Sequence, residues 1–264
     1  MNLKSSVEVR NLVVSVGDTR LVGPISFRVD RGQTLVVMGE TGAGKSLIAQ
    51  AILGALPEEL TADGQIFLDD TRIDTLDPRQ RSALFWGRHI AMLPQEPWRA
   101  LDPLMHAGKQ VIETHRHVAG LSHQASTTAM QIDFATLDLT GSEPKIPGVL
   151  SGGMAQRVAY AAATAGGAPI LLADEPTKGL DADRTETIVN LLARVPSEGG
   201  TLLAITHDTT VARRLGGEAL VLKNGDEIER GPVDQIMRAP SHPYTQVLLD
   251  AEPSAWPKQA TKSA

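Results

Sequence analysis

A glycine-rich stretch that ends in lysine and serine lies near the N-terminus of the chain. It reads Gly39-Glu40-Thr41-Gly42-Ala43-Gly44-Lys45-Ser46. Glycines let the backbone turn tightly, so that several N–H groups can point at one anion, and a following helix adds the positive end of its dipole. Lys45 would then reach the β- and γ-phosphates of a nucleoside triphosphate, while the Ser46 hydroxyl would hold Mg²⁺.

Polar residues that could act on such a phosphate follow other apolar segments of the chain. Asp174 and Glu175 follow one segment, His207 follows a second and Gln95 a third. If these segments are parallel strands of one sheet, their carboxyl ends share the edge at which α/β proteins bind ligands. Each residue alone is also consistent with an ordinary strand end or loop, but together with the glycine-rich stretch they favour a site.

These residue types suit transfer of a phosphoryl group to water, which needs positioning and charge neutralisation more than covalent chemistry. Asp174 would hold Mg²⁺ through water, and Glu175 would orient and polarise the attacking water. His207 is a candidate contact of the γ-phosphate. The Gln95 amide could contact both Mg²⁺ and the water.

A second glycine-containing sequence precedes the two carboxylates. It reads Leu150-Ser151-Gly152-Gly153-Met154-Ala155-Gln156-Arg157. Backbone N–H groups at a helix N-terminus suit contact with an anion. The glycine-rich stretch alone indicates a nucleotide-binding protein. The second sequence restricts which class of nucleotide-binding protein this chain can belong to.

The composition indicates a folded globular chain without cysteine chemistry. Its 264 residues are 42% hydrophobic and carry a formal net charge of -6, which argues against a general nucleic-acid binder. Cysteine is absent, which excludes disulfides, thiolate metal sites and cysteine nucleophiles. The start of the chain has no pattern of a secretory signal, and the longest uncharged stretch, residues 158–173, is too short to span a bilayer as a helix.

Hydrophobic patterning predicts an α/β fold with a mostly parallel sheet. Valine-rich segments at 7–16 and 25–29 are expected to form antiparallel strands. Strand signals are absent from about residue 98 to 149, which indicates an inserted helical subdomain. Asn224-Gly225-Asp226 is expected to form a hairpin turn, and the polar tail after Pro253 is expected to be frayed.

With these motifs in place, the chain resembles the ATP-binding subunit of ABC transporters over residues 7–249. The family motifs occur in the family's order: the Walker A loop (39–46), the Q-loop Gln95, the signature sequence (151–156), the Walker B residues Asp174 and Glu175, the D-loop Asp181 and the switch His207. The resemblance implies a P-loop NTPase (RecA-like) core with an N-terminal antiparallel β-subdomain and an inserted helical subdomain. We expect an ABC ATPase domain at 1–240, with the helical subdomain at about 98–160, and a C-terminal extension at 241–264.

The resemblance also implies ATP and Mg²⁺ as cofactors and a dimer that sandwiches two ATP molecules. Ser151 and Gly153 of one chain would close on the γ-phosphate that the partner's Walker A lysine holds. Integral membrane permease subunits are then expected partners, and the chain would lie at the cytoplasmic face of a bacterial cell membrane while being soluble in isolation. The alternative is a soluble, non-transport ABC ATPase, although such proteins usually carry two cassettes or a long coiled-coil insert.

A narrower resemblance points to importers of dipeptides, oligopeptides and nickel. It rests on Gln95-Glu96-Pro97, on Ala100-Leu101-Asp102-Pro103-Leu104-Met105 and on Pro240-Ser241-His242-Pro243-Tyr244-Thr245. Such importers commonly combine two different ATPase subunits, so a paralogous ATPase is expected, together with a periplasmic or extracellular solute-binding protein. The same group often holds an iron–sulfur cluster on cysteines, which this chain lacks.

Two further features bear on ligands. Val16 occupies the position at which the family usually stacks an aromatic ring on adenine, so GTP use stays open. The histidines at 106, 115, 117 and 123 could suggest nickel binding, but His115 and His117 would not share a helix face. A solvated helical surface is the preferred interpretation of this cluster.

Overall fold

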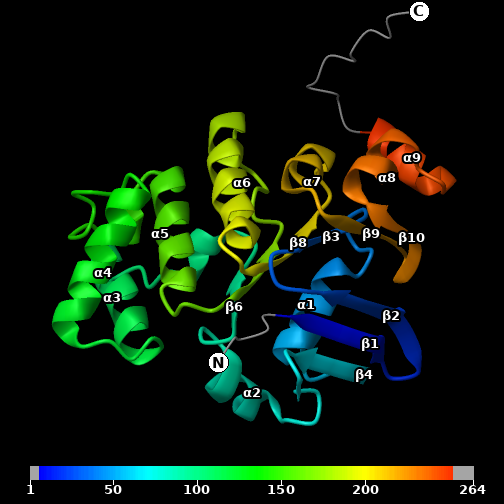
Figure 1. Ribbon diagram of the computed structural model, residues 1–264, viewed down its shortest axis with the longest axis horizontal. Helices are drawn as coiled ribbons and strands as arrows, with labels where there is room; N and C mark the ends of the chain where they lie inside the picture. Colours follow the sequence, from blue (N-terminus) through cyan, green and yellow to red (C-terminus); the bar gives the residue numbers. More distant parts are fainter. Residues whose placement is uncertain (1–5, 252–264) are drawn as a thin grey trace, which may run out of the picture.

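The computed structural model describes residues 6–251. These residues form two β-sheets with helices packed around them (Figure 1). The larger sheet has the strand order β10-β9-β3-β8-β7-β6. Its strands from β6 to β9 are parallel, and β10 pairs antiparallel with β9. The strands are β3 (Thr34–Met38), β6 (Ile90–Leu93), β7 (Ile170–Asp174), β8 (Thr201–Thr206), β9 (Glu218–Lys223) and β10 (Asp226–Pro232).

The central strands of this sheet are continuous apolar runs because both of their faces are covered. Every residue of β3, β7 and β8 is buried. Alternate residues of β3 enter different cores: Val36 and Met38 belong to the core that includes helices α3 to α8, and Leu35 and Val37 to the core shared with the N-terminal sheet. The parallel sheet is therefore a rigid platform whose carboxyl edge can hold polar groups in fixed positions.

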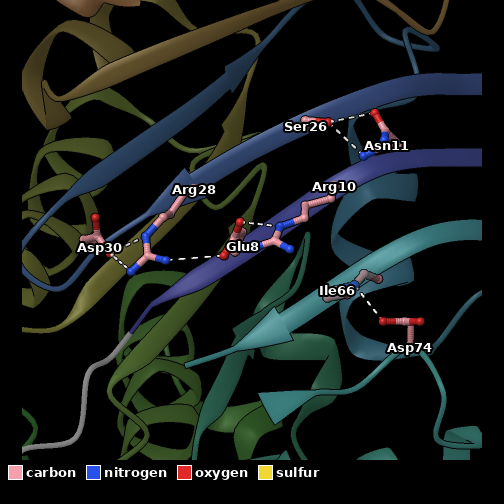
Figure 2. A network of polar contacts seen from close by, with 8 residues as sticks. All are labelled: Glu8, Arg10, Asn11, Ser26, Arg28, Asp30, Ile66 and Asp74. Atoms are coloured by element: carbon pink, nitrogen blue, oxygen red, sulfur yellow. Dashed lines mark hydrogen bonds and ion pairs between the residues drawn. The ribbon is translucent and has the colours of Figure 1, made fainter. Parts of the chain in front are cut away.

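The smaller sheet is antiparallel and has the strand order β2-β1-β4-β5. Its strands are β1 (Val7–Val16), β2 (Thr19–Val29), β4 (Leu60–Leu68) and β5 (Thr71–Arg72). One face packs on the core, while Figure 2 shows a polar network on this sheet in which Glu8 bridges Arg10 and Arg28 at 2.6 and 3.3 Å. These hydrogen bonds lower the pKa of Glu8, that from Arg10 most.

Helices cover both faces of the larger sheet. Figure 1 shows α3, α4 and α5, drawn in green, grouped at one end of the molecule, away from the N-terminal sheet. The helices are α1 (Lys45–Leu53), α2 (Pro78–Phe85), α3 (Ala107–His117), α4 (His123–Thr136), α5 (Gly152–Thr164), α6 (Ala182–Ser197), α7 (Thr209–Leu215), α8 (Val233–Arg238) and α9 (Pro243–Asp250), with 3₁₀ turns at Pro97–Ala100 and Pro147–Val149. None of the helices within 6–251 is long and apolar enough to cross a membrane.

The predicted α/β fold with its antiparallel N-terminal sheet is confirmed, and so is the hairpin turn. Asn224 and Gly225 both have positive φ between the paired residues Lys223 and Asp226, as a two-residue hairpin turn requires. The division into domains stays a prediction, and the expected frayed tail after Pro253 lies outside the described residues.

The solvated surface expected for the histidine cluster is wrong for His115. This side chain is buried, and its Nε2 lies 2.8 Å from Oδ2 of Asp133, so it joins α3 to α4. His117 instead pairs with Glu113 on its own helix at 2.9 Å and stays exposed. Within the described residues, no group of three or more His, Asp or Glu side chains could hold a metal ion.

Candidate functional site

The glycine-rich loop (residues 39–46) joins the carboxyl end of β3 to the start of α1. Gly39 and Gly44 have φ of 146° and 94°, which L side chains rarely adopt. A Cβ on Gly39 would collide with the carbonyl oxygen of Leu222, and one on Gly44 with the side chain of Val22. The glycines are therefore required by close packing of the loop against β9 and β2, as well as by its turn.

Lys45 folds back over the loop to which it belongs. Its Nζ donates to the carbonyl oxygens of Gly39 and Glu40 at 2.7 and 2.9 Å, and lies 3.6 Å from Oε1 of Glu175. The residue is only 5% exposed. Burial lowers the pKa of Lys45, and the negative charge of Glu175 opposes that shift. A further anionic partner would stabilise the charged form of an ammonium group that is so little exposed to solvent.

Ser46 and Asp174 meet beside Lys45. The Ser46 hydroxyl donates to Oδ1 of Asp174 at 3.0 Å, which joins the first turn of α1 to the last residue of β7. Asp174 is 6% exposed. Burial raises the pKa of Asp174, while the hydrogen bond from Ser46 opposes the rise. Burial thus destabilises the ionised carboxylate, and a cation held here would relieve that cost.

Glu175 is held between Lys45 and His207. It has a positive φ of 46°, uncommon for a residue with a side chain. Its backbone N–H donates to the Ile205 carbonyl at 2.8 Å, which ties it to the neighbouring strand β8. His207, at the end of β8, places Nδ1 at 2.8 and 3.0 Å from the two carboxylate oxygens of Glu175. The neighbours β3, β8 and β7 therefore deliver one connected polar network to one sheet edge.

Gln95 is not part of this network. It lies two residues beyond β6, the next strand of the sheet, with an exposed side chain. Among the described residues, no hydrogen bond joins that side chain to the glycine-rich loop or to the carboxylates. Gln95 follows the carboxyl end of β6, at the sheet edge that the sequence predicts. Its contacts with Mg²⁺ and the attacking water stay a prediction.

The signature sequence (residues 151–156) begins α5, where Ser151 is the N-cap and accepts a hydrogen bond from the Met154 N–H at 3.3 Å. Ser151 and Gly152 are exposed at the start of α5, and none of the residues in the network around Lys45 lies on this helix. Asp181 caps α6 in the same way, accepting from the Arg184 N–H at 2.9 Å. Both motifs are thus helix N-termini within the described chain.

Two connections of the site were not predicted from the sequence. The side chain of Gln156 is fully buried, and its Nε2 donates to the Pro176 carbonyl at 2.7 Å, which links the signature helix to the segment after Glu175. Tyr244 on α9 accepts a hydrogen bond from the Glu40 N–H at 3.1 Å. The Pro-Ser-His-Pro-Tyr-Thr sequence marks Tyr244 as part of a motif, but the sequence alone does not show which residue the Tyr244 hydroxyl contacts.

Comparisons with known proteins agree with this geometry. Residues 22–178 match the family model of ABC transporters, and residues 228–263 match that of the oligopeptide/dipeptide transporter C-terminal region. The ATP-binding protein CntD of a metal-staphylopine import system of Staphylococcus aureus (strain Mu50) is 35% identical over 246 residues, or 89% of this chain and 88% of that protein.

Two further proteins extend the comparison. The dipeptide transport ATP-binding protein DppD of Lactococcus lactis subsp. cremoris (strain MG1363) is 33% identical over 94% of this chain and 74% of its own length. The solved structure of the ATP-binding cassette MJ0796, a dimer in a post-hydrolysis state bound to ADP and Pi, superimposes with a TM-score of 0.74 at 26% identity and covers 86% of this chain and 98% of that one. Fold, motif order and relatives agree, and the chain belongs to the ABC transporter family as one of its ATP-binding, ATP-hydrolysing subunits.

Proposed function

We propose that the chain hydrolyses MgATP at the residues around Lys45 and so powers an importer of peptides, of nickel or metal chelates, or of a related small solute. The observation that carries the proposal is the network in which Lys45 and His207 both contact Glu175, beside the bonded pair Ser46 and Asp174. It combines phosphate-binding, cation-binding and water-activating groups at one sheet edge.

The residues present fit a nucleotide with its cation. Lys45 has three N–H donors. Two are used by the loop carbonyls, and the third side faces Glu175 at the longer distance of 3.6 Å, where a phosphate oxygen could compete. Oxygen ligands suit Mg²⁺, and Ser46 and Asp174 would hold it, Asp174 through water. Bound there, Mg²⁺ would neutralise charge on the phosphates.

Each residue then has one role in the reaction. The glycine-rich loop and Lys45 bind and orient the phosphates. Glu175 orients the attacking water and accepts its proton at a carboxylate oxygen, while His207 fixes the Glu175 carboxylate and contacts the γ-phosphate. Gln95 reaches the water and the cation once its exposed loop closes over the nucleotide. The strands behind these groups hold the polar side chains in place before the reaction. Such fixed positioning and electrostatic stabilisation are the main source of catalysis in phosphoryl transfer.

The site is completed by a second ATPase subunit in this proposal. The start of α5 bears N–H groups with no intrahelical partner, at the positive end of the helix dipole. Ser151 and Gly153 would direct these groups at a γ-phosphate bound in the partner, with Gly152, Gln156 and Asp181 shaping that contact. Closing and reopening of the pair would move membrane permease subunits, and a separate binding protein would choose the cargo.

The proposal is tested by purifying tagged, full-length protein from membranes of its host in mild detergent. We expect permease subunits and a second ATPase to co-purify, and membrane vesicles to take up a labelled dipeptide or metal chelate only with ATP. Separate uptake assays with dipeptide and with nickel distinguish the cargo classes. Purification with ribosomes or DNA, and never with a permease, would show that the transport assignment is wrong.

A further inference from the structure

The C-terminal Pro-Ser-His-Pro-Tyr-Thr sequence has no role in the chemistry above. In the fold residues 240–242 belong to the connection between α8 and α9, and residues 243–245 form the first turn of α9, at the edge of the larger sheet where β9 and β10 lie. Figure 1 shows α9, in red, at the end of the molecule opposite the α3–α5 group. Its Tyr244 nevertheless contacts the glycine-rich loop, a separation of 204 residues along the chain.

This connection is anchored to β10 by backbone hydrogen bonds. Oε1 of Glu229 accepts from the Ser241 N–H at 2.6 Å, and Oε2 accepts from the His242 N–H at 3.2 Å. His242 caps α9, since its Nδ1 accepts from the Tyr244 N–H at 3.0 Å. Tyr244 therefore lies in the first turn of a helix whose preceding residues are bonded to β10, and its hydroxyl has a defined position.

The ring of Tyr244 has a second contact next to the loop. Nζ of Lys223, the last residue of β9, lies 4.8 Å from the centre of the ring, within the range of a cation–π interaction. Leu222, the preceding residue, is the one whose carbonyl approaches Gly39. The strand end that confines Gly39 is thus the same strand end on which the Tyr244 ring rests.

The bond from Tyr244 acts on a peptide unit that Lys45 also holds. The carbonyl of Gly39 and the N–H of Glu40 belong to the same planar peptide group. Its oxygen accepts from Lys45 at 2.7 Å and its N–H donates to Tyr244 at 3.1 Å. Because a peptide group rotates as one plane, Tyr244 fixes the orientation of the carbonyl that positions the Lys45 ammonium.

We propose that Tyr244 is a positioning residue of the nucleotide site, through which the C-terminal segment keeps the Gly39–Glu40 peptide, and with it Lys45, in the orientation that binds phosphate. The inference rests on the nucleotide site proposed above. It predicts that loss of the Tyr244 hydroxyl leaves the fold intact and lowers the fraction of free protein whose loop is ready to bind. Apparent affinity falls in proportion to that fraction.

The test uses Tyr244→Phe in the full-length protein, which keeps the ring and its contact with Lys223. Tyr160→Phe is the matched control, because Tyr160 is the only other tyrosine of the chain and its hydroxyl donates to the Leu191 carbonyl between α5 and α6 at 3.2 Å. Each variant is titrated with a fluorescent ATP analogue and assayed for MgATP hydrolysis and melting temperature.

We expect Tyr244→Phe to weaken nucleotide binding and raise KM by roughly two- to tenfold, the range expected for one hydrogen bond, with a smaller change in kcat. Tyr160→Phe should leave affinity and KM unchanged. Glu229→Ala, which releases the segment from β10, should raise KM in the same direction as Tyr244→Phe. Equal affinities and KM values for Tyr244→Phe, Tyr160→Phe and the unaltered protein would overturn the inference, whatever their melting temperatures.

Lys45→Ala separates this inference from the nucleotide site on which it rests. If Lys45→Ala weakens binding and Tyr244→Phe does not, the site stands and the role of Tyr244 is wrong. If neither variant changes affinity, the nucleotide is bound elsewhere and both assignments fail.

Discussion

Replacement of Glu175 by glutamine should separate nucleotide binding from hydrolysis. The amide has nearly the shape of the carboxylate, so its oxygen can still face Lys45 and its NH₂ group can face Nδ1 of His207 in the appropriate tautomer. These are the contacts that hold Glu175 now, at 3.6 Å from Lys45 and 2.8 Å from His207. Fold and affinity should therefore survive, while the group that accepts a proton from water is lost.

The size of the effect follows from the role assigned to Glu175. A positioned general base contributes about 10²- to 10⁴-fold to a rate, which corresponds to roughly 3–5 kcal/mol of activation free energy. Glu175→Gln should lower kcat for MgATP by that factor and change the dissociation constant of ATP far less, because the amide oxygen can still face Lys45.

The assay is phosphate release at saturating MgATP, with binding measured separately by equilibrium titration. Glu198→Gln is a suitable control because Glu198 lies at the exposed end of α6 and pairs with Arg194. That change should affect neither quantity. Turnover of Glu175→Gln at the rate of the unaltered protein would refute the role of Glu175, and a parallel loss of ATP binding would show that its contribution is structural.

Three further changes test other parts of the site. Lys45→Ala should weaken ATP binding by roughly tenfold or more, as expected for loss of a charge-assisted bond of about 1.5–3 kcal/mol, and unchanged affinity in a titration would exclude Lys45 as a phosphate ligand. Asp174→Asn should abolish hydrolysis yet raise the melting temperature without metal or nucleotide. Burial raises the pKa of Asp174 in the fold, so the ionised carboxylate lowers the stability of the fold at neutral pH. The gain in melting temperature from Asp174→Asn should therefore shrink as the pH falls toward about 4, the pKa in the unfolded chain. An equal gain at both pH values would contradict that origin. Val16→Tyr should tighten ATP binding by about 1–3 kcal/mol if the exposed end of β1 faces adenine, whereas the same affinity as Val16→Leu would place the base elsewhere.

The fold and the main groups of the site follow from local patterns in the sequence. The apolar run of β3 and the glycines after it predict a buried strand and a tight loop, because both are properties of neighbouring residues. Asp174, Glu175 and His207 could be assigned to one sheet edge because parallel strands place their carboxyl ends together. The structure confirms that sheet. It places Glu175 between Lys45 and His207, and it bonds Asp174 to Ser46.

Other features depend on contacts between distant segments, which no local pattern specifies. The buried side chain of His115 bonds to Asp133 on the following helix. The bond between Tyr244 and Glu40 requires both the loop and the anchored C-terminal segment. Gln156 could be assigned to a motif, but its hydrogen bond to Pro176 depends on how α5 lies against the segment that follows β7.

We propose that this chain forms a working site only together with a second ATPase subunit. The most direct measurement is the molar mass of the full-length Glu175→Gln protein by light scattering, with any ATPase subunit that co-purifies with it. We expect ATP to cause pairing, ADP not to cause it, and Ser151→Arg at the start of α5 to prevent it. Absence of ATP-dependent pairing in Glu175→Gln, together with hydrolysis at the unaltered rate in Ser151→Arg alone, would contradict the claim.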